Sequence, residues 1–252
     1  CGSAKAILAG GIEKVSNSPY TLHFMKNNIK RTLKKALPKY EEIKNSVLEN
    51  DMAYISEALA RNWNITRRMQ DGFTTDSIAK ALSANGRGMF QDEIMPIAYD
   101  IDGEQHRLSE DELLLQKRSE TQIEWAEPMF IQDGTVTQYN AAPMCDCAAA
   151  MLLMDFEAAL YAGIRPLAVI RTVQSIGIEK DEIGGAMVRC VQAILDKSKL
   201  AVSDIGLFEI NESFAVQALY TIQMLGLEPR KDNVNGGNLA LGYPIGATGM
   251  RM

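Results

Sequence analysis

The feature that most constrains the fold is an alternation of short apolar runs with helical patterns in the second half of the chain. These runs and patterns occupy, in order, residues 148–154, 155–162, 166–176, 183–196, 207–210 and 211–225. Strands and helices in alternation are typical of layered α/β domains, in which ligands bind at the carboxyl ends of the strands. The sequence therefore predicts an α/β fold with its site at those strand ends.

Upstream of this region the composition changes. From Ser16 to about Glu127 the chain is polar and rich in Lys, Arg, Glu and Asn, with helical patterns at Asp51 to Trp63 and at Thr66 to Ala84. A short apolar run, Ala6 to Ala9, precedes it and ends in Gly10-Gly11, as a buried strand does at a tight turn. We interpret the polar segment as an insertion into the α/β scaffold.

The helix predicted from Thr66 carries its own boundary signals. Thr66 can cap its N-terminus, and Asn85-Gly86 can end it. A stripe of apolar side chains recurs at helical spacing, at Met69, Phe73, Ile78 and Leu82. We expect this stripe to be the buried face of the helix, with a packing role alone.

Composition excludes several classes of function. The 252 residues are 46% hydrophobic and carry a net charge of −6, so nothing suggests a nucleic-acid partner. No apolar run approaches the roughly 20 residues of a membrane-spanning helix, and we expect a soluble cytoplasmic protein. Cys145 and Cys147 are too close for a metal knuckle, and His23 and His106 lie far from both. We interpret Cys145, Cys147 and Cys190 as packed core residues and expect no metal.

Two polar segments could carry chemistry. Asn211-Glu212-Ser213-Phe214-Ala215 lies where a predicted strand meets a helix, and there Asn211 could hold a water or an oxyanion. Alternatively, Asn211 is simply the N-cap of that helix. The second segment, Asn233 to Gly249, places five glycines around Pro244, so its backbone can approach a ligand closely. It has neither the ending of a phosphate loop nor the spacing of a dinucleotide fingerprint.

Together these segments resemble the thiolase family. Thiolases carry Asn-Glu-Ala-Phe-Ala and, one helix later, Asn-Val-Asn-Gly-Gly running into Ala-Leu-Gly-His-Pro-Ile-Gly-Ala-Ser-Gly. This chain has Asn211 to Ala215 and Asn233 to Gly249 in the same order. Leu8 to Ser16 resembles the family's Ala-Gly-Gly-Met-Glu strand and turn, and Gly88 to Ile97 resembles its Gly-Arg-Phe-x-Asp-Glu-Ile-x-Pro-Val. The resemblance covers essentially the whole chain.

The resemblance implies an internal fragment of a thiolase, with a layered αβα fold and an inserted loop domain, incomplete at both ends. It divides the chain into the end of the N-terminal domain, the inserted domain that covers coenzyme A, a return to the N-terminal domain and the first part of the C-terminal domain, at residues 1–20, 21–134, 135–160 and 161–252. By family resemblance we expect a homodimer or homotetramer.

The resemblance also implies an acyl-CoA C-acyltransferase that condenses acyl-CoA thioesters or cleaves 3-ketoacyl-CoA. A cysteine would take up the acyl group, a second cysteine would move a proton, and oxyanion holes would hold the developing charge. Coenzyme A is then a substrate, and no other cofactor is expected. Asn211 matches the Asn that holds a water in one hole, and Tyr243 replaces the His of Gly-His-Pro. The substrate-binding positions are Met52, Ala142, Phe214 and Gly246.

Cys1-Gly2-Ser3 matches the letters of the family's nucleophile motif but not its context. Only Ala4 to Leu8 separate it from the Ala-Gly-Gly strand, whereas thiolases place a helix and a strand between the two. We interpret Cys1 as the end of a helix, with the nucleophile upstream of it and the second catalytic cysteine beyond Met252. The fragment alone is therefore expected to be inactive and poorly stable.

Tyr243 leaves two functions open. A phenol cannot accept the nucleophile's proton as an imidazole does, because its ordinary pKa is near 10 rather than near 6.5. It can still donate a hydrogen bond to an oxyanion. One hypothesis is thus a divergent acyltransferase that uses Tyr243 as a donor, and the other is a non-catalytic protein that binds acyl-CoA or a partner subunit. Other acyl-transfer chemistry remains a third possibility.

Overall fold

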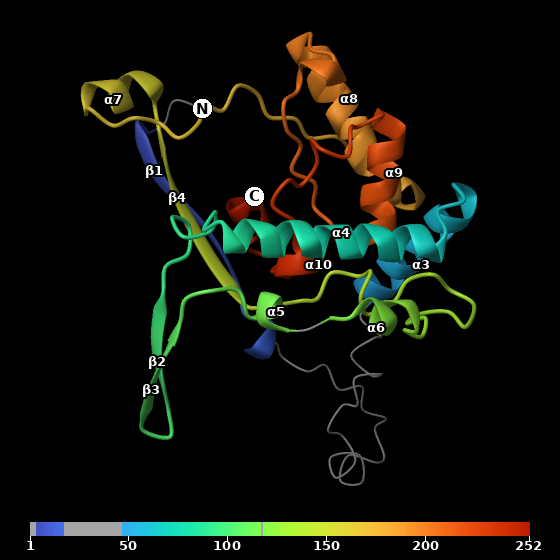
Figure 1. The fold of residues 1–252 in the computed structure, drawn as a ribbon. Coiled ribbons are helices and arrows are strands. Elements are labelled where there is room, and N and C mark those ends of the chain that lie inside the picture. The colour runs from blue at the N-terminus through green and yellow to red at the C-terminus, as the bar shows by residue number, and fades with distance from the viewer. Residues whose placement is uncertain (1–3, 18–46, 117) are drawn as a thin grey trace, which may run out of the picture.

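The computed structural model describes residues 4–17, 47–116 and 118–252, and Figure 1 shows the arrangement of their helices and strands. The predicted feature at Cys1-Gly2-Ser3 and most of the first third of the predicted insertion lie outside the described residues. In chain order the elements are β1 (Ala6–Glu13), η1 (Val15–Asn17), α3 (Val47–Asn62), α4 (Arg67–Gly86), β2 (Ile97–Ile101), β3 (Glu104–Leu108), α5 (Glu112–Leu115), α6 (Glu120–Glu124), β4 (Cys147–Met154), α7 (Phe156–Tyr161), η2 (Lys180–Gly185), α8 (Ala186–Ser198), η3 (Val202–Asp204), α9 (Ala215–Leu225), α10 (Asn238–Leu241) and α11 (Thr248–Arg251).

Strands β1 and β4 form an antiparallel pair that joins the two ends of the predicted insertion. The register runs from Ala6 opposite Met154 to Glu13 opposite Cys147. Both strands were predicted to be buried, and this is wrong for the described residues, in which Leu8 is 76% and Leu152 57% exposed. Apolar sequence predicts a strand, but its burial depends on which other elements cover it.

Gly10 and Gly11 lie inside β1 rather than in the predicted turn after it. The backbone of Gly246 passes so close to this strand that a Cβ added at Gly11 would lie 2.3 Å from the Gly246 carbonyl oxygen. A glycine within a strand often marks such an approach by another backbone. Gly11 therefore marks a contact with the C-terminal segment, whereas Gly10 lies against Ala149 and Ala150 of β4.

Helix α4 starts as predicted, but only Phe73 and Ile78 of its predicted stripe pack against the apolar clusters. The Thr66 hydroxyl accepts a hydrogen bond from the Met69 N–H at 3.3 Å, as expected of an N-cap. Met69 and Leu82 of the predicted stripe are 44% and 48% exposed. The buried side chains of α4 are small or polar: Gln70, Thr74, Ser77, Ala81 and Ala84. This helix crosses the middle of the molecule and packs against α9 and α10 (Figure 1). The polar side chains on its buried face can therefore hydrogen-bond to backbone groups of the loops beside it.

Helix α4 also ends slightly later than predicted. It continues through Asn85-Gly86, and the left-handed residue after it is Gly88, with φ +72°. One side of the helix packs with Phe90, Leu114 and Leu241 into a small apolar cluster. A second apolar cluster lies between α8 and α9, around Val188, with Phe73 of α4 packed against it.

The later elements agree with the sequence only in part. The helix predicted at 155–162 is found as α7, which Asp155 caps by accepting from the Ala158 N–H at 3.0 Å, and Gly163 follows it with φ +71°. Residues 166–176 were predicted to form a strand, but they belong to no strand. The strand predicted at 207–210 is reduced to a single parallel bridge between Phe208 and Asp232.

The segment interpreted as an insertion also contains a hairpin that was not predicted. Strands β2 and β3 pair from Ile97 opposite Leu108 to Ile101 opposite Glu104, leaving Asp102-Gly103 as the turn. Both turn residues have positive φ, at 53° and 87°. An Asp-Gly pair between alternating residues is a strong hairpin signal, and it was available in the sequence. Within the described residues, no helix is long and apolar enough to cross a membrane.

Candidate functional site

The side chain of Asn211 lies between those of Tyr243 and Asn238. Its Nδ2 donates a hydrogen bond to the Tyr243 hydroxyl oxygen at 3.3 Å, and its Oδ1 accepts one from Asn238 Nδ2. The alternative role of Asn211 as a helix N-cap is wrong, because α9 begins four residues later and has Phe214 at its N-cap. Asn211 is therefore held by side chains from the glycine-rich segment instead of by its own helix.

The segment that contains Ala142 runs beside both motifs. Ala141 forms an antiparallel bridge with Phe214, and the Ala142 N–H donates to the Ser213 carbonyl at 3.0 Å. The next residue, Pro143, accepts from the Tyr243 N–H at 2.7 Å. Four predicted site residues, Asn211, Tyr243, Ala142 and Phe214, are thus brought together.

The other two predicted substrate-binding residues lie apart from this group. Gly246 lies against β1, where its N–H donates to Glu13 Oε2 at 3.0 Å, and a Cβ added to it would lie 2.4 Å from the Ile12 carbonyl oxygen. Met52 is partly buried on α3, and the hydrogen bonds that join Asn211, Tyr243 and Asn238 do not include it. Its role stays a prediction.

Buried polar groups on α3 and α4 hold the loop that leads to Ala142. The Glu57 carboxylate accepts from the Thr135 N–H, the Thr135 hydroxyl and the Val136 N–H, each at 2.9 Å. Asn140 is fully buried, and its Nδ2 donates to Asp71 Oδ1 at 3.0 Å. A Cβ at Gly134 would lie 2.4 Å from Glu57 Oε1, so only glycine permits this approach. The two helices therefore fix the loop through hydrogen bonds.

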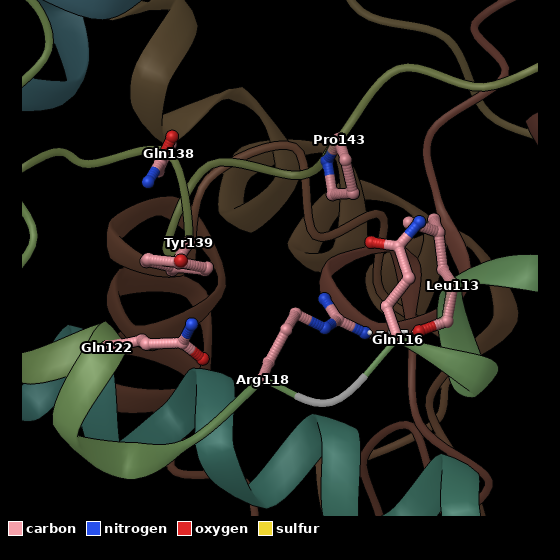
Figure 2. Close-up of a pocket in the computed structure, with 7 residues that line it drawn as sticks. All are labelled: Leu113, Gln116, Arg118, Gln122, Gln138, Tyr139 and Pro143. Carbon is pink, nitrogen blue, oxygen red and sulfur yellow. Dashed lines mark hydrogen bonds between the residues drawn. The ribbon is translucent and has the colours of Figure 1, made fainter.

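A cavity of about 240 Å³ opens beside this loop (Figure 2). Among the described residues that line it, Arg118 is the one cation, and its guanidinium is already engaged, with Nη1 donating to the Leu239 carbonyl at 2.8 Å and Nη2 to the Ala240 carbonyl at 2.9 Å. Arg118 thus ties α10 to the segment between α5 and α6. The cavity is lined by Leu113, Gln116, Arg118, Gln122, Gln138, Tyr139 and Pro143.

The three described cysteines are each partly buried. Cys145 lies against the backbone of Gly242, where an added Cβ would lie 2.5 Å from the Cys145 sulfur. Gly242 has φ +99°, which favours glycine on conformational grounds as well. Burial raises the pKa of the Cys145 thiol to about 11 and also raises that of Cys147. At neutral pH both are thiols rather than nucleophilic thiolates, which agrees with a packing role.

Sequence reasoning missed Asn238 and Arg118. Asn238 stands directly after Gly236-Gly237, and the signal was present, since a polar side chain after two glycines begins the short helix α10. Arg118 gave no local signal, because its partners Leu239 and Ala240 are about 120 residues away in the sequence. No group of three or more His, Cys, Asp or Glu side chains in the described part of the chain is arranged to hold a metal ion.

Comparison with known families decides the identity. The family model described as the thiolase N-terminal domain matches residues 1–157, and that of the thiolase C-terminal domain matches residues 164–252. The chain belongs to the thiolase family. Among similar proteins, a probable acetyl-CoA acyltransferase of Staphylococcus aureus (strain COL) is 36% identical and a 3-ketoacyl-CoA thiolase of Bacillus subtilis (strain 168) is 34% identical, each matched over 100% of this chain.

Solved structures show that this thiolase chain also has the fold of the family. An acetyl-CoA acetyltransferase of Bacillus anthracis matches with a TM-score of 0.86 at 32% identity, covering 99% of this chain and 64% of that one. A thiolase of Ascaris suum, solved in complex with coenzyme A, matches with a TM-score of 0.85 at 28% identity and the same coverages. The predicted α/β fold class is therefore confirmed. The chain spans 65% and 64% of the lengths of the two relatives named above.

Proposed function

We propose that the full-length thiolase containing this chain transfers acyl groups between acyl-CoA thioesters, with Asn211 and Tyr243 as hydrogen-bond donors to the thioester oxygen. The observation that carries this proposal is the hydrogen bond from Asn211 Nδ2 to the Tyr243 hydroxyl. Carbon–carbon bond formation or cleavage next to a thioester places negative charge on the carbonyl oxygen. Donors held ready for that charge are among the strongest contributions to catalysis.

The direction of this hydrogen bond leaves two donors for a substrate. Tyr243 accepts from Asn211 and so keeps its own O–H, while one N–H of the Asn211 amide is not used. Asn238 donates to Asn211 Oδ1, so a flip of the Asn211 amide would bring two N–H groups together. The amide is therefore held with its nitrogen toward Tyr243. Neither free hydrogen has an acceptor among the described residues.

Tyr243 suits a donor role better than a basic one. A phenol is protonated at neutral pH and can stabilise an enolate-like oxygen by donation. Activation of a nucleophilic cysteine would then come from other groups, such as a helix N-terminus. With Tyr243 at this position, another group would accept the proton of the nucleophilic cysteine, while the oxyanion site keeps its hydrogen-bond donor.

The cavity beside the loop supports acyl-CoA as the ligand. Pro143 lines it, and the Pro143 carbonyl accepts from the Tyr243 N–H, so cavity and donor pair share one loop. Gln116, Gln122 and Gln138 offer side-chain amides there (Figure 2). Amides of this kind can bind the amide groups of a pantetheine arm. The Ascaris suum relative was solved with coenzyme A bound.

Thiolysis of acetoacetyl-CoA by the full-length gene product tests the proposal, followed as the loss of substrate absorbance. The native protein is compared with Tyr243→His and Tyr243→Phe. Turnover by the native protein that falls in the Phe variant supports the donor role. Turnover only in the His variant would show that one residue removes the chemistry, and would favour the non-catalytic acyl-CoA-binding or partner protein instead.

Three further expectations belong to this proposal. Homodimer or homotetramer formation and the division of the chain at residues 20, 134 and 160 follow from family resemblance, and a cytoplasmic location follows from the composition. Sedimentation of the full-length gene product measures the first of them. A monomer would contradict it without affecting the donor pair.

A further inference from the structure

A buried serine on α4 contacts both chemical segments of the chain. Ser77 is 2% exposed, and its hydroxyl donates to Glu212 Oε2 at 2.9 Å while it accepts from the Gly237 N–H at 3.0 Å. Glu212 follows Asn211, and Gly237 precedes Asn238. One side chain of the inserted segment is therefore tied to the neighbours of both members of the Asn211–Asn238 pair.

Glu212 is a fully buried carboxylate at the centre of this arrangement. Its Oε1 accepts from Asn233 Nδ2 at 2.7 Å, and its Oε2 accepts from the Leu239 N–H at 3.1 Å as well as from Ser77. Burial raises the pKa of Glu212, and these hydrogen bonds oppose the rise. Because an N–H can only donate, both nitrogen partners favour the ionised form. The carboxylate is thus an acceptor for three converging donors.

The backbone around Glu212 is shaped for this contact. A Cβ added at Gly237 would lie 2.2 Å from the Glu212 carboxyl carbon. The next turn begins α10, whose Leu239 N–H bonds Glu212 and whose Asn238 side chain bonds Asn211. Any movement of the Glu212 carboxylate therefore moves the start of α10 and, with it, the group that orients Asn211.

We propose that Ser77 and Glu212 are positioning residues for the Asn211–Tyr243 donor pair. Through them, the inserted helix α4 sets the orientation of the donors. This inference rests on the proposed acyltransferase function, since it names residues that act through Asn211. Neither residue touches the substrate in this scheme. Their effect is on how the Asn211 amide is aimed at the thioester oxygen.

The kinetic test uses Ser77→Ala in the full-length gene product, with Ser83→Ala on an exposed position of the same helix as the matched control. We expect kcat for acetoacetyl-CoA thiolysis to fall about 10- to 100-fold in Ser77→Ala, because small misplacements of catalytic groups carry costs of that size. KM should stay within about twofold. An unchanged kcat, or a fall in kcat of the same size in Ser83→Ala, would overturn the inference.

A double variant separates positioning from general damage. If Ser77 acts through Asn211, Ser77→Ala should lower kcat in the native background and have little further effect in Asn211→Ala. Equal losses in both backgrounds would show that Ser77 acts by another route. If Asn211→Ala itself has native activity, the proposed role of the donor pair fails first.

A crystal structure of Ser77→Ala provides a readout that needs no turnover. We expect the Asn211 Nδ2 to Tyr243 hydroxyl distance to lengthen beyond hydrogen-bond range relative to the native crystal structure. An unchanged distance would overturn the positioning role whatever the activity. An inactive native protein whose Asn211 still shifts in the variant would instead end the proposed function and leave the positioning inference standing.

Discussion

Asn211 Nδ2 donates to the hydroxyl oxygen of Tyr243 across 3.3 Å, although the two residues are 32 positions apart. The tyrosine is the acceptor in this contact and retains its own proton. Histidine, the family residue at this position, could accept or donate according to its protonation. The phenol cannot switch in this way, so what the pair offers a substrate is its two unused hydrogens, the Tyr243 O–H and one Asn211 N–H.

Replacement of Tyr243 by Phe removes one donor and little volume. We expect kcat for thiolysis to fall by roughly 10²- to 10³-fold, the usual effect of losing one oxyanion-hole donor, with KM nearly unchanged. Steady-state kinetics of the full-length gene product measure this. Tyr161→Phe is the control, since Tyr161 is 97% exposed. Equal activity of both variants would contradict the donor role.

Asn238→Asp tests the orientation of Asn211. The change replaces a donor by an oxygen opposite Asn211 Oδ1, so the Asn211 amide should flip and turn its oxygen toward Tyr243. We expect a loss of kcat, because Asn211 then presents its oxygen instead of its N–H to Tyr243, together with a loss of about 1–3 kcal/mol of stability, because a carboxylate replaces an amide at a buried position. Asn235→Asp in the same loop is the control, since its Oδ1 accepts from Arg87 and an Asp oxygen can do the same. Native kcat in Asn238→Asp would show that this contact does not orient Asn211.

Features of the fold that depend on local chemistry were predictable from sequence. The Thr66 cap, the Asp155 cap and the left-handed Gly163 each involve neighbours within four residues, and all three are found. Asp102-Gly103 belongs to the same class, and its hairpin could have been predicted. Such signals need no knowledge of distant partners.

Burial and the site geometry depended on partners far away in sequence. The apolar spacing of α4 predicted its buried face, but the helix turns Ser77 inward because Glu212, 135 residues later, needs a donor. Likewise, the run ending at Gly10-Gly11 gave a strand in which Gly11 accommodates the backbone of Gly246. Tertiary contacts of this kind override a periodic pattern. Motif resemblance found Asn211 and Tyr243, but not Asn238, whose side chain holds that of Asn211.

Two glycine replacements that involve α4 should change stability in opposite directions. Gly236 has φ +78°, and a Cβ added there would lie 2.6 Å from the Cβ of Ala81. Gly236→Ala should therefore lower the free energy of unfolding by about 1–3 kcal/mol. Gly72 lies within α4 with nothing near its added Cβ, so Gly72→Ala should raise stability by about 0.5–1 kcal/mol. Denaturant unfolding of the full-length gene product measures both. A stabilised Gly236→Ala would show that α4 and the glycine-rich segment are not in close contact.

Cys145 should make stability fall at alkaline pH. Burial raises the pKa of its thiol from the ordinary 9.0 to about 11, so between these values the unfolded chain loses a proton that the folded chain keeps. The native state then binds more protons than the unfolded state, and the free energy of unfolding decreases as pH rises. The stabilising contribution is fully present below pH 9 and is lost as the pH passes about 11.

We therefore expect the alkaline decline in the unfolding free energy to be less steep in Cys145→Ala than in the native protein. Denaturant unfolding at pH 8, 9.5 and 10.5 measures the two slopes. Ionisable groups that both proteins share contribute equally to each slope, so the difference between the slopes reports the contribution of Cys145. Cys190→Ala is the control for loss of a partly buried thiol elsewhere. Rapid alkylation of Cys145 by iodoacetamide at pH 8, at the rate of an unfolded cysteine, would contradict the raised pKa, because only the thiolate reacts.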